Sequence, residues 1–145
     1  MCEGRVSDEQ LPRHRARGVY ALVIQMARAQ LLSVGRLGPQ LMPAGVYVYV
    51  GSAMGASSQN LHGRIQRHLS GAKRTHWHID AILAAPNAAV ASVVFAETSR
   101  RLECQLVSNL QSTGSANVPV QGLGASDCRG GCRSHLLLFP GTQAN

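Results

Sequence analysis

The chain has 145 residues, of which 45% are hydrophobic, so it is long enough for one domain with a substantial core. With 14 Lys and Arg against 7 Asp and Glu, its formal net charge of +7 favours a polyanionic partner or an acidic membrane surface. A GC-rich genome is the alternative source of the arginine excess. No apolar run approaches the ~20 residues of a membrane span, and no hydrophobic leader follows Met1. We therefore expect no membrane partner and a cytoplasmic protein with reduced cysteines.

The first part of the chain is rich in predicted strands. Residues 1–17 contain four arginines and few apolar side chains. This composition predicts a flexible basic arm that tethers nucleic acid; the alternative is an N-terminus without a role. Apolar, β-rich runs predict strands at residues 18–26, 31–37 and 45–52. Because side chains alternate along a strand, Tyr47 and Tyr49 share one face of the third strand.

Two amphipathic helices are predicted further along. The helix over residues 59–70 has an apolar stripe of Leu61, Ile65 and Leu69. The helix over residues 100–111 has a stripe of Leu102, Leu106 and Leu110, with Ser99 as its candidate cap. The remaining elements are a short helix or strand at residues 76–85, a strand at 90–96 and an edge strand at 136–139. The sequence thus predicts an α/β (α+β) domain over residues 18–139, with a small, mostly antiparallel central sheet flanked by helices, and a tail at 140–145.

Four short motifs follow one another along this domain. They are Gly18-Val19-Tyr20, Tyr49-Val50-Gly51, the helix start Asn60-Leu61-His62-Gly63-Arg64, and Glu103 with Leu106 in the next helix. Their order resembles the GIY-YIG nuclease superfamily, and the third motif is similar to the nuclease half of bacterial excision-repair incision proteins. A long excursion at residues 27–46 separates the two tyrosine motifs. This excursion resembles the insertion found in a small standalone branch of the superfamily, whose members are mostly described as domains of unknown function.

The resemblance implies a role for each motif residue in phosphodiester hydrolysis. It makes Tyr20 the base candidate and Tyr49 its partner at the phosphate or water. Glu103 would hold one Mg²⁺, or Mn²⁺, together with waters and phosphate oxygens. Arg64 would stabilise the developing charge and lower the pKa of a tyrosine, and His68, one turn on, is an alternative proton shuttle. From spacing alone, however, the tyrosines are equally well core residues, Arg64 a solvated helix residue and Glu103 a first-turn carboxylate favoured by the helix dipole.

Basic and aromatic residues beyond the first helix are candidates for nucleic-acid binding. Arg67, Lys73 and Arg74 would contact phosphates, and Trp77 would stack on a base. The alternative is a packed Trp77 with hydrogen-bonded histidines beside it.

A second candidate site lies near the C-terminus. Cys128, Cys132 and His135 form a Cys-x3-Cys-x2-His pattern, for which Cys104 or His76 would supply the fourth ligand of a structural zinc ion. This spacing is not one of the strong paired zinc patterns, so metal-free thiols are the favoured interpretation.

The sequence therefore predicts a metal-dependent endonuclease that hydrolyses DNA. The alternatives are a non-catalytic nucleic-acid-binding module on the same fold and a zinc-stabilised interaction domain.

Overall fold

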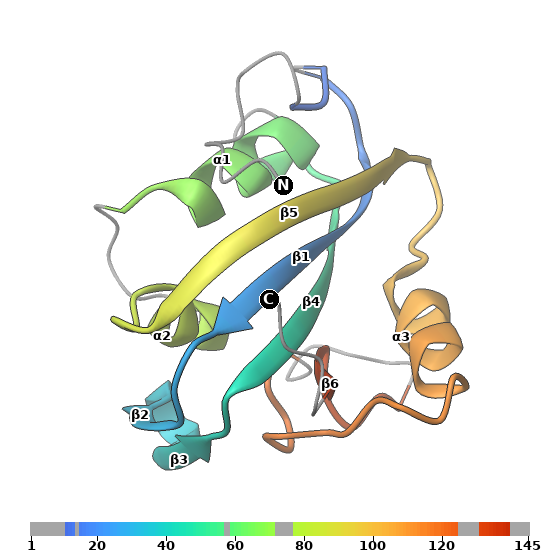
Figure 1. Ribbon diagram of the computed structural model, residues 1–145. Helices are drawn as coiled ribbons and strands as arrows, with labels where there is room; N and C mark the ends of the chain where they lie inside the picture. Colours follow the sequence, from blue (N-terminus) through green and yellow to red (C-terminus); the bar gives the residue numbers. More distant parts are fainter. Residues whose placement is uncertain (1–10, 14, 57–58, 72–76, 125–130, 140–145) are drawn as a thin grey trace.

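The computed structural model describes residues 11–13, 15–56, 59–71, 77–124 and 131–139. Its elements, in chain order, are β1 (Gly18–Met26), β2 (Gln30–Ser33), the 3-10 turn η2 (Gly35–Leu37), β3 (Pro39–Met42), β4 (Gly45–Ala53), α1 (Leu61–Leu69), α2 (His78–Leu83), β5 (Ala88–Glu97), α3 (Glu103–Gln111) and β6 (Leu136–Phe139). The main sheet is antiparallel with the order β5-β1-β4-β6, and β2 and β3 form a separate hairpin (Figure 1). The predicted α+β class, with a small antiparallel sheet flanked by helices, is confirmed.

The two faces of the sheet carry two hydrophobic cores because side chains alternate along β1 and β4. Tyr20 and Tyr49 belong to the larger core, which α1 and α2 cover through residues such as Ile65 and Ile79. The other face is covered by α3, which contributes the buried Val107 to the smaller core. In Figure 1, α1 and α2 accordingly lie on the side of the sheet opposite α3.

Two motif glycines are explained by close approaches inside the sheet. A Cβ on Gly18 would lie 2.0 Å from the carbonyl oxygen of Ala96 in β5. Gly51 lies opposite Tyr20 in the β1–β4 register, and a Cβ there would lie 2.5 Å from the Tyr20 hydroxyl oxygen. The absence of a side chain at Gly51 therefore leaves the space that the Tyr20 ring occupies.

Several predicted elements differ from the observed ones. The strand predicted at residues 31–37 is confirmed only as far as Ser33, where β2 ends. The chain then makes the turn η2 and returns through Gly38, whose φ of 73° favours glycine. In α1, the predicted stripe is confirmed at Leu61 and Ile65, but its last position is occupied by the buried His68, and Leu69 is only partly buried.

The second predicted helix starts later and packs differently than expected. It begins at Glu103, with Leu102 at the N-cap position and no capping side chain, so the prediction of Ser99 as the cap is wrong. The three leucines of the predicted stripe are only partly buried around Val107. The late start brings Glu103 into the first turn of α3, next to the end of β4.

The predicted N-terminal arm is described only in its last part, and this part contacts the domain. Ala16 is buried, and its carbonyl accepts a hydrogen bond of 3.0 Å from the amide of Leu61. The Arg13 guanidinium forms an exposed ion pair of 2.9 Å with Glu97. Among the described helices, none combines the length and apolar character that crossing a membrane requires.

Candidate active site

One pocket of about 530 Å³ collects most of the predicted catalytic side chains. The residues that line it come from β1, β4, α1, α2 and α3 and from the loops beside them, namely Tyr20, Tyr49, Gly51, Ser52, Met54, Gly55, Gln59, Arg64, Trp77, His78, Arg101, Glu103, Gly124 and His135. Four of the five predicted catalytic residues are therefore neighbours of one cavity. The fifth, His68, is buried against Tyr20.

The two tyrosines enter the pocket from adjacent strands. Tyr20 on β1 and Tyr49 on β4 have ring centroids 6.5 Å apart, and both are largely buried, with 2% and 9% of their surface exposed. Gly124 makes room for the second ring, since a Cβ there would lie 2.9 Å from Cε1 of Tyr49. Tyr47 lies outside the pocket, and its hydroxyl donates to the carbonyl of Pro43 at 2.5 Å, as a structural residue would.

The Tyr20 hydroxyl oxygen lies 2.7 Å from Nε2 of His68, which α1 contributes. Both side chains are buried, so this hydrogen bond is shielded from water. His68 thus contacts the pocket through Tyr20, which is the geometry that a proton shuttle needs.

Burial dominates the protonation of both tyrosines. It raises the pKa of Tyr20 above its usual range, and the neighbouring Tyr49 raises it further, while Arg64 and Arg67 lower it by less. Burial also raises the pKa of Tyr49 to about 12, against a smaller lowering by Arg64. The lowering by Arg64 was expected and is present, but desolvation of a phenolate in this core outweighs the attraction of the guanidinium.

Ser52 connects the remaining two catalytic candidates. Its hydroxyl donates a short hydrogen bond to the Glu103 carboxylate, and its carbonyl accepts one of 3.5 Å from the Arg64 guanidinium. Arg64 also donates to Oε1 of Gln59 at 3.0 Å. The sequence analysis missed Ser52, although it directly follows the motif Tyr49-Val50-Gly51.

Of the residues predicted to contact nucleic acid, the structure describes Arg67 and Trp77. Arg67 donates two hydrogen bonds of 2.9 Å to the buried carboxylate of Asp80, and its guanidinium lies 4.2 Å from the centre of the Trp77 ring. Arg64 lies 4.7 Å from the same ring centre. Trp77 therefore packs against two arginines at the pocket wall. Lys73 and Arg74 lie outside the described residues.

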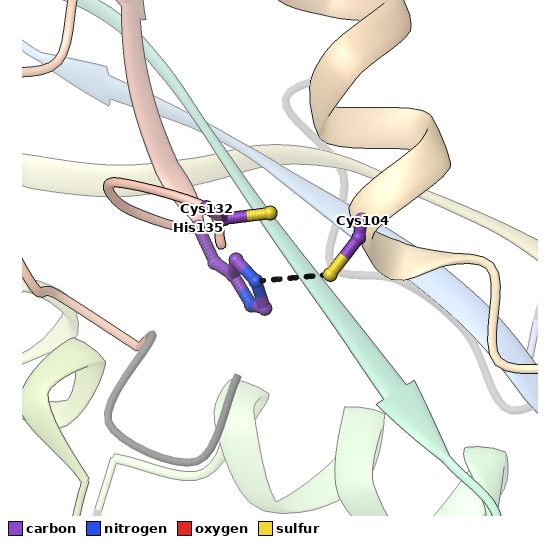
Figure 2. A group of neighbouring side chains, drawn as sticks. All are labelled: Cys104, Cys132 and His135. Atoms are coloured by element: carbon purple, nitrogen blue, oxygen red, sulfur yellow. Dashed lines mark hydrogen bonds between the residues drawn. The ribbon is translucent and has the colours of Figure 1, made fainter. Parts of the chain in front are cut away.

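Part of the predicted cysteine-histidine site also assembles. Cys104 in the first turn of α3 meets Cys132 and His135, which precede β6, and their ligand atoms all lie within 4.8 Å of one another (Figure 2). Of the two residues predicted as a further ligand, Cys104 and His76, it is Cys104 that lies beside Cys132 and His135. Cys128 and His76 fall among the residues that the structure does not describe.

Comparison with known proteins gives one match. The model of a protein family described as "Domain of unknown function DUF123" matches residues 19–145, which is most of the chain. Neither the curated proteins nor the solved structures contain a match.

Proposed function

This chain belongs to the DUF123 family, and from its pocket we propose that it is a metal-dependent endonuclease that hydrolyses DNA phosphodiester bonds. The observation that carries the proposal is the convergence of Tyr20, Tyr49, Arg64 and Glu103 on a single pocket. These residues come from β1, β4, α1 and α3, so their meeting is not a consequence of sequence proximity. Their order along the chain supports membership of the GIY-YIG superfamily as part of the same proposal.

The charge of the pocket and of the chain suits a phosphate ester. Arg64 and Arg101 both line the pocket, and the chain carries a formal net charge of +7. A guanidinium matches the oxygens of a phosphate through two parallel hydrogen bonds. The general basic surface would add affinity that does not depend on base sequence and that falls with salt.

The pocket also fits a divalent cation of the magnesium type. Mg²⁺ in proteins is commonly held by one or two carboxylates together with waters and substrate phosphates. Glu103 is the carboxylate among the described lining residues, and the Ser52 hydroxyl orients it. A bound Mg²⁺ or Mn²⁺ would supply Lewis-acid polarisation of the phosphoryl oxygens.

The buried Tyr20–His68 pair provides a route for the proton of the attacking water. At neutral pH Tyr20 is a neutral phenol, because burial raises its pKa. In the tautomer with the proton on Nδ1, Nε2 of His68 accepts the Tyr20 proton over 2.7 Å. The phenolic oxygen then takes the proton of the water, and His68 carries the positive charge. Tyr20 acts as the base only together with His68.

Arg64 and Tyr49 complete the set of roles. The guanidinium is held by Ser52 and Gln59 at the pocket wall, where it would stabilise the charge that develops on the phosphoryl oxygens. Tyr49, whose pKa is also raised by burial, stays a hydrogen-bond donor at neutral pH and would orient the phosphate or the water.

A cleavage assay tests the proposal. The full chain is incubated with plasmid, single-stranded and branched DNA in the presence of Mg²⁺ or Mn²⁺, beside Glu103→Ala prepared in the same way. We expect cleavage that requires the metal and is lost in the variant. Activity that persists unchanged in Glu103→Ala contradicts the site. DNA binding without cleavage of any substrate contradicts the enzyme and supports the binding module instead.

A further inference from the structure

We propose that Cys104, Cys132 and His135 form a zinc site that is separate from the magnesium-type site of the pocket. Figure 2 shows the two thiols and the imidazole directed toward one another, with Cys104 on α3 and the other two in the segment that precedes β6. Their ligand atoms lie within 4.8 Å of one another. The proposal does not depend on nuclease activity, because it concerns residues that bind no substrate in the proposed reaction.

The distance between the Cys104 and His135 ligand atoms is close to the edge of a zinc coordination tetrahedron. Zn–S bonds of about 2.3 Å and Zn–N bonds of about 2.0 Å place a sulfur and a nitrogen ligand roughly 3.5 Å apart. Sγ of Cys104 and Nε2 of His135 are 3.9 Å apart. A movement of a few tenths of an ångström therefore brings these two atoms to ligand distance.

The protein backbone holds the histidine ligand in place before any metal binds. The amide of His135 donates to the carbonyl of Leu123 at 2.9 Å, and the carbonyl of His135 accepts from the amide of Val50 at 2.9 Å. The neighbouring Ser134 is fully buried and hydrogen-bonds the Leu123 carbonyl at 3.3 Å. His135 is therefore attached to β4 on one side and to the preceding loop on the other.

Ligand chemistry selects zinc over the other common ions. Thiolates are soft ligands that Mg²⁺ and Ca²⁺ avoid, whereas two thiolates with one imidazole suit tetrahedral zinc. Cys104 and Cys132 are thiols rather than halves of a disulfide, so no S–S bond competes for their sulfur atoms. Three ligands leave the fourth position of the tetrahedron to water or to another donor.

Zinc at this position would connect α3 to the segment before β6. Cys104 follows Glu103, and His135 lines the same pocket as Glu103. The ion would thus immobilise the first turn of α3, from which the Glu103 carboxylate reaches Ser52. The site is in this way a positioning device for the pocket as well as a cross-link of the fold.

Metal analysis of the purified chain tests the site directly. After loading with excess Zn²⁺ and desalting under reducing conditions, we expect about one zinc per chain. Zinc affinity should fall by more than ~10-fold in Cys104→Ser, Cys132→Ser and His135→Ala, because even changes behind the ligands cost about 10–100-fold. Cys2→Ser removes a thiol outside the proposed ligand set and should keep its zinc. Equal zinc in all variants, or none in the original chain, overturns the proposal.

Cobalt substitution supplies a test that needs no variant to fold. Co²⁺ titrated into the unaltered chain should produce thiolate-to-cobalt charge-transfer absorption, and Zn²⁺ should abolish it by competition. If Cys104→Ser folds, its absorption should fall by roughly half, since one of two thiolates is lost. The absence of this absorption in the unaltered chain, or a Cys104–Cys132 disulfide in protein kept under reductant, would overturn the site.

Discussion

The hydroxyl of Tyr20 and Nε2 of His68 are 2.7 Å apart in a part of the core where each side chain exposes 2% of its surface. A hydrogen bond so shielded from solvent is costly to leave unmade, and its geometry suits proton transfer. Burial keeps Tyr20 protonated at neutral pH, so the histidine is needed for the tyrosine to act as a base.

Replacing Tyr20 with phenylalanine should abolish most DNA cleavage without unfolding the domain. The ring stays, but the oxygen that accepts the proton of the water is lost, and such groups commonly contribute about 10²–10⁴-fold in rate. The measurement is the single-turnover cleavage rate with Mg²⁺. Tyr47→Phe is the matched control, because its hydroxyl binds the Pro43 carbonyl and lies outside the pocket. Equal losses in both variants would contradict the assignment.

His68→Gln should change the pH profile as well as the rate. Without the imidazole, the Tyr20 proton has no base beside it, and the rate at neutral pH should fall by roughly 10²-fold. The remaining activity should rise steadily with pH, because ionisation of Tyr20 then depends on solvent. A variant that keeps the original pH profile with only lower stability would show that His68 is a packing residue.

Gly51→Ala should move Tyr20 and thereby reduce cleavage. The new Cβ would lie 2.5 Å from the Tyr20 hydroxyl oxygen, so the ring must leave its place beside His68. Overpacking of this kind costs about 1–3 kcal/mol of the free energy of unfolding. Gly71→Ala is the control, since a Cβ there meets no atom within 4 Å. Urea unfolding and cleavage rates of the two variants give the comparison, and full activity in Gly51→Ala would argue against the site.

Asp80→Ala should be among the most destabilising changes in the domain. The Asp80 side chain is 1% exposed, accepts both hydrogen bonds of Arg67 and also accepts one of 2.8 Å from the Trp77 amide. Removing one partner of such a buried pair costs about 3–5 kcal/mol. The measurement is again urea unfolding. Glu97→Gln breaks the exposed pair with Arg13 and should leave the unfolding midpoint nearly unchanged.

Alkaline pH should destabilise the fold through its buried tyrosines. Burial raises the pKa of Tyr47 and of Tyr49 to about 12 in the folded state, against about 10 when unfolded. Their contribution to stability is complete below about pH 10 and is lost as the pH rises toward about 12. Urea midpoints measured between about pH 9 and about pH 11 should fall, and the fall should be shallower in Tyr49→Phe. An unchanged slope in that variant would contradict a buried phenol.

Local patterns in the sequence determine much of this fold. The alternation of Tyr47 and Tyr49 with valines predicted the two faces of β4, and Asn60 marks the start of α1, where its side chain accepts from the amide of Gly63 at 2.9 Å. Such signals depend on residues only a few positions apart. The final edge strand was predicted for the same reason.

The contacts that make the site are decided only by the tertiary structure. Tyr20 and His68 are 48 positions apart, Ser52 and Glu103 are 51 apart, and Cys104 and His135 are 31 apart. No local periodicity encodes which of these side chains meet, because that depends on the strand order β5-β1-β4-β6 and on where α3 begins. The pKa of Tyr20 is likewise decided by the tertiary structure, since burial in the assembled core raises it more than the nearby cations lower it. The sequence alone determined which residue types are available for chemistry, and packing decided their partners and their protonation.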